Sequence, residues 1–352
     1  MQPVFGSMRR VRMGIAGLGR LGQLHAENMA GRAPSIELVR VVDPIQDVAR
    51  STGERLGVAW STAFDDLLND PAIEAVVIAS PTASHAPMIE QAAAAGKQIF
   101  CEKPVSLERE ATEQAIAAAH AAGAKLQIGF HRRFDPDWAA ATSRIRAGEL
   151  GDVYLFRTSL RDMRPPSLDY IRSSGGFFLD VTVHDFDTAR WMIGEIDEVS
   201  AFGGALSDPA FAAVGDIDTA LVVLRFASGA LGVIDNSRVA GYGYECSTEV
   251  MGSRATARVG YHRRVNVEWL APGAASVDYV SNFIERYPRA YVLELEQFAT
   301  AVRADRPVAV TGEDALAAFT LCQAADRSYR QGGGAVRLRH ADRGGQAVYE
   351  LV

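Results

Sequence analysis

The sequence has 352 residues, of which 48% are hydrophobic and 22% are charged, and its formal net charge is -7. This composition is that of an ordinary globular protein with room for two domains, and the negative charge argues against nucleic acid as the main partner. There is no apolar run of about 18 residues, so we expect no membrane span. The three cysteines, Cys101, Cys246 and Cys322, lack metal-ligand spacing. We therefore expect no metal site and a cytoplasmic location.

A short strand and a glycine-rich turn open the first domain. Residues 11–16 are typical of a buried strand and residues 23–29 of a helix, with a G-x-G-x-x-G pattern from Gly17 to Gly22 between them. In this context the glycines allow a tight turn and a close approach to a pyrophosphate, and the helix N-terminus offers N–H groups to the phosphates. A purely structural turn is the alternative. We expect the dinucleotide to contact Gly17, Leu18, Gly19, Arg20 and Leu21.

The end of the second predicted strand bears on the choice of cofactor. Residues 37–42 lead into Asp43, which lies 21 residues beyond Gly22. A carboxylate at this place can accept hydrogen bonds from the hydroxyls of an adenosine ribose, and it repels a 2′-phosphate. The sequence therefore favours NAD over NADP, with a turn aspartate before Pro44 as the alternative.

Strands and helices then alternate along the chain. Helices are predicted over residues 47–57, 65–68, 87–95 and 107–122, and strands over 75–79, 98–100 and 126–130. This alternation indicates a doubly wound α/β sheet, which binds ligands at its carboxyl edge. Ser80, Pro81 and Thr82 follow a strand at that edge, so we expect them to line the nicotinamide half of the cofactor. His85 begins a helix, where a cofactor contact and a packing role are both open.

The strand over residues 98–100 leads into Cys101-Glu102-Lys103-Pro104. Pro104 restricts Lys103 to extended geometry, which aims its ammonium group along the strand end. Together with residues 78–82, this stretch resembles the E-K-P region of the Gfo/Idh/MocA oxidoreductase family. The resemblance implies an NAD-binding Rossmann domain, with Glu102 and Lys103 at the cofactor and Lys103 beside the reacting carbon.

The stretch Phe130 to Pro136 resembles the G-F-x-R-R-F-D-P segment of the inositol dehydrogenases within that family. The resemblance makes His131 and Arg132 candidates for the substrate site. A salt bridge at a domain interface is an equal alternative for Arg132 and for Arg133. We place the boundary here, with an NAD-binding domain over residues 8–133 and a substrate-binding and oligomerisation domain over 134–352. Residues 1–7 precede the first domain.

Strands dominate the second domain. They are predicted over residues 153–160, 198–202, 220–226, 230–236, 245–252 and 255–259. Such a succession indicates an α+β domain with a large open, mainly antiparallel sheet. Helices follow over residues 285–302 and from a cap at Thr311 to about Arg330. In the family these carboxy-terminal helices return to the first domain, and residues 337–352 are an edge strand or a tail.

A second stretch with chemistry lies between the first two of these strands. If residues 177–193 are helical, Asp180 and His184 lie at i and i+4 on one face. Such a pair alone is more often a surface ion pair. With the E-K-P motif, however, it resembles the catalytic set of the family, with His184 as the base, Asp180 as its partner and Lys103 polarising the substrate oxygen. Asp185 and Asp187 are expected at the helix surface or an interface, and a part in substrate binding is the alternative for Asp185.

Further candidates rest on weaker grounds. Tyr242-Gly243-Tyr244 resembles a turn that borders the substrate in inositol dehydrogenases, and this implies a substrate contact for Tyr242, with packing as the equal alternative. Arg161, Asp162 and Arg164 form a polar segment that could face polyol hydroxyls.

The sequence thus predicts an NAD-dependent enzyme that oxidises a secondary hydroxyl of a cyclic polyol or sugar to a ketone, like an inositol 2-dehydrogenase. Alternatives are a pyranose dehydrogenase for glucose or levoglucosan, an NAD-dependent glycosidase and a non-catalytic sensor. A sensor has no need of a general base such as His184. The resemblance also implies a homo-oligomer, a tetramer or a dimer, formed through the exposed face of the second sheet.

Overall fold

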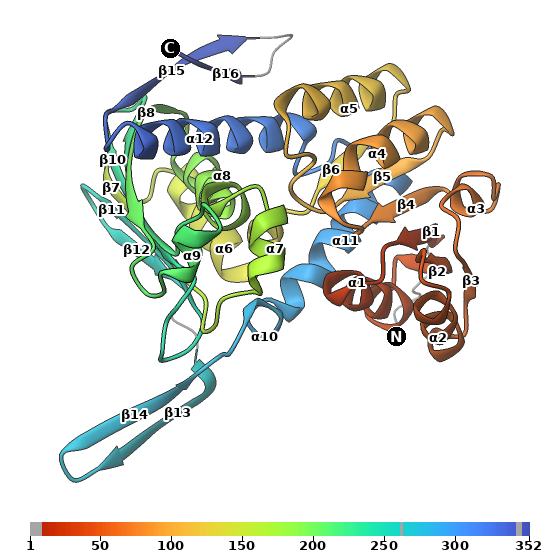
Figure 1. The fold of residues 1–352 in the computed structure, drawn as a ribbon, viewed down its shortest axis with the longest axis horizontal. Coiled ribbons are helices and arrows are strands. Elements are labelled where there is room, and N and C mark those ends of the chain that lie inside the picture. The colour runs from red at the N-terminus through yellow and green to blue at the C-terminus, as the bar shows by residue number, and fades with distance from the viewer. Residues whose placement is uncertain (1–8, 261–262, 343–346) are drawn as a thin grey trace, which may run out of the picture. The chain divides into compact units, whose positions relative to one another are not determined.

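The computed structural model describes residues 9–260, 263–342 and 347–352 (Figure 1). The segment 1–7 and part of the predicted tail, residues 343–346, lie outside the described residues. The chain divides into two compact units. The first contains residues up to 131 together with 289–316, and the second contains residues 132–288 together with 317–352. Among the described residues, the helices are all too short or too polar to cross a membrane.

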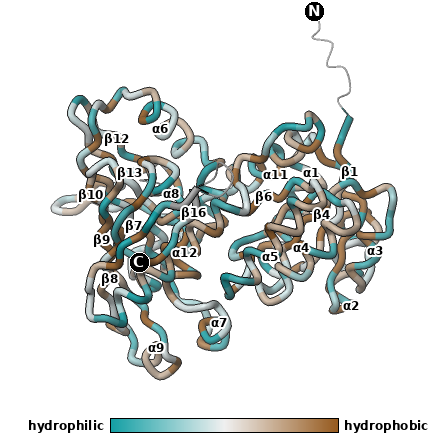
Figure 2. Tube along the Cα trace, turned by 90° about the horizontal axis from the view of Figure 1, so that it is seen from above, coloured by the Kyte–Doolittle hydropathy of each residue, from teal (hydrophilic) through white to brown (hydrophobic). Residues whose placement is uncertain are grey.

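The first unit is built on six parallel strands in the order β3-β2-β1-β4-β5-β6, which confirms the predicted doubly wound sheet. The strands are β1 (Val11–Ala16), β2 (Ile36–Val42), β3 (Ala59–Ser61), β4 (Ala75–Ile78), β5 (Gln98–Cys101) and β6 (Leu126–Ile128). Every residue of β4 is apolar and buried, as expected for a central strand of such a sheet (Figure 2). The strand order reverses between β1 and β4, so the ligand crevice of the fold is expected at their carboxyl ends.

Helices connect these strands. They are α1 (Arg20–Gly31), α2 (Gln46–Leu56), α3 (Asp65–Leu68), α4 (His85–Ala94) and α5 (Arg109–Ala121), with the 3-10 turn η1 (Thr82–Ser84) ahead of α4. A helix from much later in the chain, α11 (Pro288–Arg303), completes the core of this unit. Its residues Leu295 and Phe298 are fully buried in one cluster with Met13, Ile15 and Phe100.

The second unit contains an eight-stranded sheet in the order β12-β11-β7-β10-β9-β8-β15-β16. Its strands are β7 (Val153–Arg161), β8 (Ile196–Gly204), β9 (Thr219–Phe226), β10 (Leu231–Ser237), β11 (Glu245–Gly252), β12 (Thr256–Val259), β15 (Val336–Asp342) and β16 (Ala347–Leu351). Only β7 and β10 pair in parallel, and the other neighbours described pair antiparallel. The predicted open, mainly antiparallel sheet is confirmed.

The helices of the second unit are the 3-10 turn η2 (His131–Phe134), α6 (Pro136–Arg146), α7 (Leu168–Ser173), α8 (Val183–Ile193), α9 (Ala210–Ala213), α10 (Phe283–Arg286) and most of α12 (Gly312–Arg330). The prediction of one regular helix over residues 177–193 is wrong, because a π-helical turn, η3 (Phe178–Thr182), precedes α8. The single helix predicted over 285–302 is also wrong. Pro288 has no N–H to continue a helix, so α10 ends at Arg286 and α11 begins anew.

A hairpin that the sequence reading missed belongs to the second unit. Strands β13 (Arg263–Ala271) and β14 (Ala274–Tyr279) pair across a two-residue turn at Pro272 and Gly273. The hairpin extends away from the eight-stranded sheet (Figure 1). It leaves Trp269 71% exposed and Leu270 73% exposed. Its alternating Val and Trp residues and its Pro-Gly turn were local signals of a hairpin.

Candidate functional site

The glycine-rich turn between β1 and α1 has the shape of a phosphate cradle. Gly17 has φ +89, and a Cβ there would lie 2.4 Å from the backbone nitrogen of Ser80. A Cβ at Gly22 would lie 1.9 Å from the carbonyl oxygen of Gly17, whereas one at Gly19 would meet no atom within 4 Å. Gly19 is also the N-cap of α1, and no side chain caps that end. Space over Gly19 and a helix start that no side chain caps are what a dinucleotide pyrophosphate needs.

Asp43 ties the second strand to this turn. Its buried carboxylate accepts hydrogen bonds from the backbone N–H groups of Leu18 (2.8 Å) and Ile45 (2.9 Å). A carboxylate has about four acceptor sites, so these two bonds leave capacity for the hydroxyls of a ribose. The structure therefore places Asp43 next to the glycine-rich turn, where the fingerprint requires it.

The turn after β4 is held by its own serines. The hydroxyls of Ser80 and Ser84 lie 2.7 Å apart, and Ser84 donates to the carbonyl of Pro81 at 2.8 Å. Pro81 is exposed, and Ser80 and Thr82 are half-buried. Because β4 neighbours β1, this turn stands at the carboxyl edge beside the glycine-rich turn.

His85 joins that turn to the next one. Its ring nitrogens lie 2.8 Å (Nε2) from the carbonyl oxygen of Ser80 and 2.7 Å (Nδ1) from the carbonyl oxygen of Pro104. The residue is buried. A packing role was one of the two roles left open for His85. The ring is packed between two backbone turns, with one carbonyl oxygen near each ring nitrogen.

Residues 102–104, here called the Lys103 turn, follow β5 at the same edge of the sheet. The N–H of Glu102 donates to the carbonyl of Ile78, and the N–H of Gly129 donates to the carbonyl of Cys101. The backbone of β5 is thereby held between its neighbours up to the point where Lys103 begins. Lys103 and Pro104 are half-buried.

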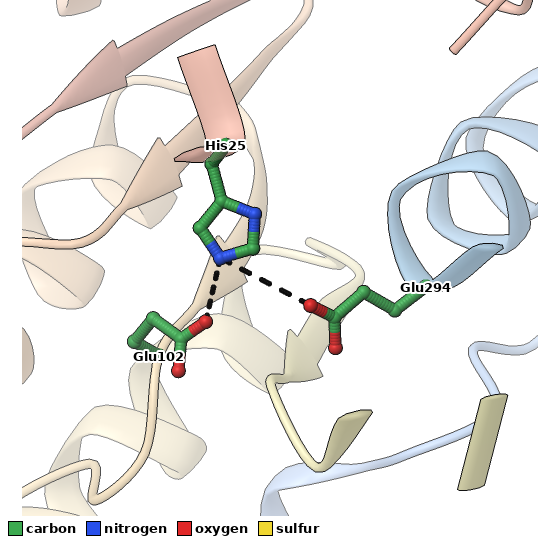
Figure 3. A group of neighbouring side chains, drawn as sticks. All are labelled: His25, Glu102 and Glu294. Atoms are coloured by element: carbon green, nitrogen blue, oxygen red, sulfur yellow. Dashed lines mark hydrogen bonds and ion pairs between the residues drawn. The ribbon is translucent and has the colours of Figure 1, made fainter. Parts of the chain in front are cut away.

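The side chain of Glu102 points away from solvent into a cluster with His25 of α1 and Glu294 of α11 (Figure 3). These three residues, here called the buried carboxyl cluster, are 0% (His25), 6% (Glu102) and 0% (Glu294) exposed. Nε2 of His25 lies 2.6 Å from Oε1 of Glu102 and 4.0 Å from Oε1 of Glu294. Burial, and next the charge of Glu102, raise the pKa of Glu294 well above its ordinary value.

The buried carboxyl cluster has the residue types of a metal site, and its three ligand atoms lie within 4.8 Å of one another. Ligand atoms around a tetrahedral ion with bonds of about 2.1 Å stand about 3.4 Å apart. The 2.6 Å between His25 and Glu102 is instead the length of a charge-assisted hydrogen bond. The arrangement therefore fits a shared proton better than a metal ion.

In the second unit, Asp180 is held by two donors. The hydroxyl of Tyr170 donates to Oδ1 at 2.8 Å, and Nη1 of the buried Arg238 donates to Oδ2 at 2.8 Å. Arg238 also faces Asp216 at 3.5 Å. Burial, and next the charge of Asp180, raise the pKa of Tyr170, so the phenol stays a donor.

His184 stands in the first turn of α8, directly after the π-helical turn that carries Asp180. The residue is half-buried, and its carbonyl accepts a hydrogen bond from the hydroxyl of Thr188 at 2.7 Å. Asp180 and His184 therefore occupy consecutive turns. The turn between them is wider than an α-helical turn, a feature that is frequent at functional sites.

The two arginines of η2 form buried ion pairs inside the second unit. Nη1 of Arg132 lies 2.6 Å from Asp185, and Nη2 of Arg133 lies 2.6 Å from Asp187. Asp185 also accepts hydrogen bonds from Thr158 (3.2 Å) and from Asn236 (3.0 Å). The expected surface position of Asp185 and Asp187 is wrong, because arginine partners satisfy both carboxylates and allow their burial. Arg132 and Arg133 thus both form salt bridges, as one alternative held, but these bridges join residues of the second unit.

The remaining candidates have mixed surroundings. His131 is buried and stacks on Tyr291, with 4.8 Å between the ring centroids. Tyr242 is 47% exposed, donates its hydroxyl to Glu245 and accepts a bond from Arg161 at 3.0 Å. Burial, and next the bond to Glu245, raise the pKa of Tyr242.

Four residues that contact Glu102 or Asp180, or lie in the buried carboxyl cluster, were not predicted from the sequence. They are His25, Glu294, Tyr170 and Arg238. His25 lies just beyond the glycine-rich pattern, but its partner Glu294 is separated from it by most of the chain. No local periodicity or spacing links such pairs, so only the folded chain reveals them.

Comparisons with known proteins agree on one family. The family model described as "Oxidoreductase family, NAD-binding Rossmann fold" matches residues 11–130, and the model described as "GFO/IDH/MocA C-terminal domain" matches residues 138–258. The chain is 40% identical over 325 residues to scyllo-inositol 2-dehydrogenase (NAD(+)) of Bacillus subtilis, with 92% of this chain and 95% of the relative covered. It is 41% identical over 326 residues to myo-inositol 2-dehydrogenase of Thermotoga maritima, with 91% and 97% covered.

A solved structure agrees as well. The scyllo-inositol dehydrogenase of Lactobacillus casei, with bound cofactor NAD(H) and scyllo-inositol, superposes with a TM-score of 0.87 at 30% identity. The match covers 94% of this chain and 99% of the other. Both units of the chain therefore have counterparts in one solved enzyme.

Proposed function

The chain belongs to the GFO/IDH/MocA family of NAD-binding oxidoreductases, and from this premise we propose that it oxidises a secondary hydroxyl of an inositol, at the 2-position, to a ketone. The observation that carries the proposal is the identity of 40% and 41% to two inositol 2-dehydrogenases over more than nine-tenths of the chain. The first unit supplies the NAD-binding Rossmann fold.

The glycine-rich turn and Asp43 would hold the adenosine and pyrophosphate parts of NAD. The space over Gly19 and the uncapped start of α1 support this role. The turns at Ser80 and Lys103 stand at the same edge of the sheet and would flank the nicotinamide. The chemistry that NAD supplies when bound is acceptance of a hydride from the carbinol carbon.

Three side chains would serve the substrate hydroxyl. His184 accepts the hydroxyl proton as the C–H bond breaks and the C=O bond forms. The ammonium group of Lys103 stabilises the negative charge that develops on the oxygen. Asp180 would keep His184 oriented and favour its protonated form. The bonds from Tyr170 and Arg238 would hold the carboxylate of Asp180 in place for this role.

The test is a set of initial rates of NADH formation with inositol stereoisomers, glucose and levoglucosan, for the wild type and Lys103→Ala. We expect one inositol to be oxidised, and the variant to lose at least about a hundredfold in kcat, as when one oxyanion-stabilising donor is removed. The matched control is Lys125→Ala, which removes a lysine that pairs with Asp305. It should keep the wild-type rate.

Other outcomes would redirect the assignment. Oxidation of glucose or levoglucosan but of no inositol would make the protein a pyranose dehydrogenase. Release of an aryl leaving group without net NADH would indicate a glycosidase. NAD binding without turnover of any of these rings would contradict the proposed activity.

We also propose that the protein is a homo-oligomer of the cytoplasm. Strands β8, β9, β10 and β11 of the second unit leave five apolar side chains between 39% and 52% exposed: Phe202, Leu221, Val223, Leu231 and Met251. A second copy of the chain is the partner best suited to such a face, because it would offer the same apolar surface. The three cysteines are buried and free, as is usual in a reducing compartment.

A further inference from the structure

We propose that two buried histidines, His25 and His85, are positioning residues for Lys103, because each of them fixes one of its two chain neighbours. His25 acts through the carboxylate of Glu102, and His85 acts through the carbonyl of Pro104. The inference rests on the proposed role of Lys103 in stabilising the substrate oxygen. A flexible side chain with four methylene groups loses least entropy at a reacting atom when its backbone is already fixed.

The bond on the Glu102 side is short and well supported. Nε2 of His25 and Oε1 of Glu102 share one hydrogen bond of 2.6 Å, which is the length of a charge-assisted bond. The ring of His25 is held edge-on by Phe100 (5.6 Å) and Tyr291 (5.8 Å). His25 therefore has little freedom to move away from Glu102.

Gly129 faces the carboxylate of Glu102, and its missing side chain leaves the space that this carboxylate occupies. A Cβ added at Gly129, at the end of β6, would lie 3.0 Å from Cδ and from both oxygens of Glu102. This is tighter than ordinary van der Waals contact. Even the smallest side chain at this position would require the carboxylate of Glu102 to shift by a few tenths of an ångström.

The third member of the buried carboxyl cluster, Glu294, differs from Glu102 in its hydrogen bonds. Both oxygens of Glu294 and Nδ1 of His25 are buried and make no hydrogen bond to other residues that the structure describes. An ionised carboxylate in that position would bear the full cost of desolvation, and repulsion from Glu102 would add to it. The pKa of Glu294 is therefore raised well above its ordinary value, and the hydrogen bond of His25 is made to Glu102.

On the other side of Lys103, His85 couples two turns. Its ring reaches the carbonyl of Pro104 at 2.7 Å and the carbonyl of Ser80 at 2.8 Å. The Ser80 turn follows β4, and the Lys103 turn follows the neighbouring strand β5. The ring of His85 thus lies between the turn proposed to flank the nicotinamide and the turn that carries Lys103, and a ring N–H can donate to either carbonyl.

The decisive experiment compares His25→Leu and His85→Leu in the wild type and in a Lys103→Ala background, with saturating NAD and inositol. In the wild type we expect each change to lower kcat by about tenfold to a hundredfold, the effect of losing one or two buried hydrogen bonds at a reacting group. In the Lys103→Ala background, each should lower the residual rate by less than about twofold, because the positioned group is already absent.

Two further variants keep the test informative if a leucine substitution prevents folding. His25→Gln restores an N–H donor and should recover part of the lost kcat, with KM for NAD unchanged. Gly129→Ala leaves all polar groups in place, yet it should lower kcat by displacing Glu102. The matched control is Thr52→Val, which removes a buried hydrogen bond to Gln23 elsewhere in the same unit. It should lower Tm without lowering kcat.

The outcomes separate the two proposals. If Lys103→Ala retains wild-type activity, the proposed role of Lys103 fails, and the positioning role fails with it. If Lys103→Ala is impaired but the histidine variants are equally harmful in both backgrounds, the proposed function stands. The histidines are then structural residues, and the positioning role is overturned.

Discussion

Asp43 has two roles: it holds the glycine-rich turn by a hydrogen bond, and we propose that it selects NAD over NADP. Its carboxylate holds the backbone N–H of Leu18 within the glycine-rich turn, at a distance of 2.8 Å. The same negative charge would repel the 2′-phosphate of NADP. Asp43→Asn keeps one acceptor oxygen in the same place and removes the charge. We expect the ratio of kcat/KM for NAD to that for NADP to fall by about tenfold, the effect of about 1.4 kcal/mol.

The measurement is the rate of reduced-cofactor formation at several concentrations of each dinucleotide. Asp47→Asn is the matched control, because this exposed carboxylate of α2 pairs with Arg50 rather than with the turn. An unchanged ratio in Asp43→Asn would mean that another group excludes the 2′-phosphate.

Glu294 gives the first unit a pH-dependent stability. Burial and the charge of Glu102 raise its pKa in the folded protein above that in the unfolded chain. At a pH between these two pKa values the folded state binds more protons, so the free energy of unfolding falls as the pH rises. The contribution of Glu294 to stability is complete below its unfolded pKa and is lost as the pH rises through its folded pKa.

Glu294→Gln should therefore remove part of that slope. We expect the variant to gain stability over the wild type as the pH increases above the ordinary range of a glutamate, which urea unfolding at several pH values would measure. Glu296→Gln is the control, because Glu296 lies on the same helix, is only half-buried and accepts a bond from the N–H of Ser35. A parallel pH dependence for wild type and Glu294→Gln would show that Glu294 is ionised in the folded protein.

At the scale of helices, strands and turns, the sequence predicted those elements whose backbone conformation depends on one residue type. The glycine-rich turn between β1 and α1 and the capping pair of Thr311 and Asp314 on α12 were predicted. The π-helical turn η3 was not, since a helical period does not reveal one added residue per turn. The burial of Asp185 was missed because its partner Arg132 lies 53 positions away.

The carboxylate of Asp135 stabilises two helices of the second unit, α6 and α10. Asp135 caps α6 by accepting bonds from the N–H groups of Asp137 and Trp138, and its other oxygen pairs with Arg286 of α10 at 3.1 Å. Both charged side chains are buried. Asp135→Ala loses the cap and leaves Arg286 unpaired, so we expect a loss of about 3–5 kcal/mol in the free energy of unfolding.

Urea denaturation of three variants checks this prediction. Asp135→Asn keeps the cap and should be less damaging than Asp135→Ala. The double variant Asp135→Ala/Arg286→Met should recover stability relative to the single one, because no charge is left unpaired. Asp137→Ala changes an exposed carboxylate in the same first turn and should cost less than about 1 kcal/mol. Equal losses for Asp135→Ala and Asp137→Ala would refute the role of the ion pair.

At the scale of the whole molecule, each unit is assembled from two separate stretches of the chain. The core of the first unit needs α11, whose Phe298 packs on Phe100 at a centroid distance of 6.0 Å. This return of the chain also brings Glu294 to His25. A contact of that kind depends on topology rather than on local sequence, which is why the motifs were predicted and the buried carboxyl cluster was not.

The exposed face of the eight-stranded sheet is where the oligomeric state can be tested. Leu221 and Val223 point outward from β9, while Ala220, Val222 and Leu224 between and beside them are buried. Leu221→Glu/Val223→Glu would bring carboxylates into an apolar interface, where no partner awaits them. In light scattering we expect the wild type to be a dimer or tetramer and the variant to have a smaller mass. The control Trp269→Glu, on the exposed hairpin, should keep the wild-type mass. If Trp269→Glu alone dissociates the protein, the hairpin and not the sheet face joins the subunits.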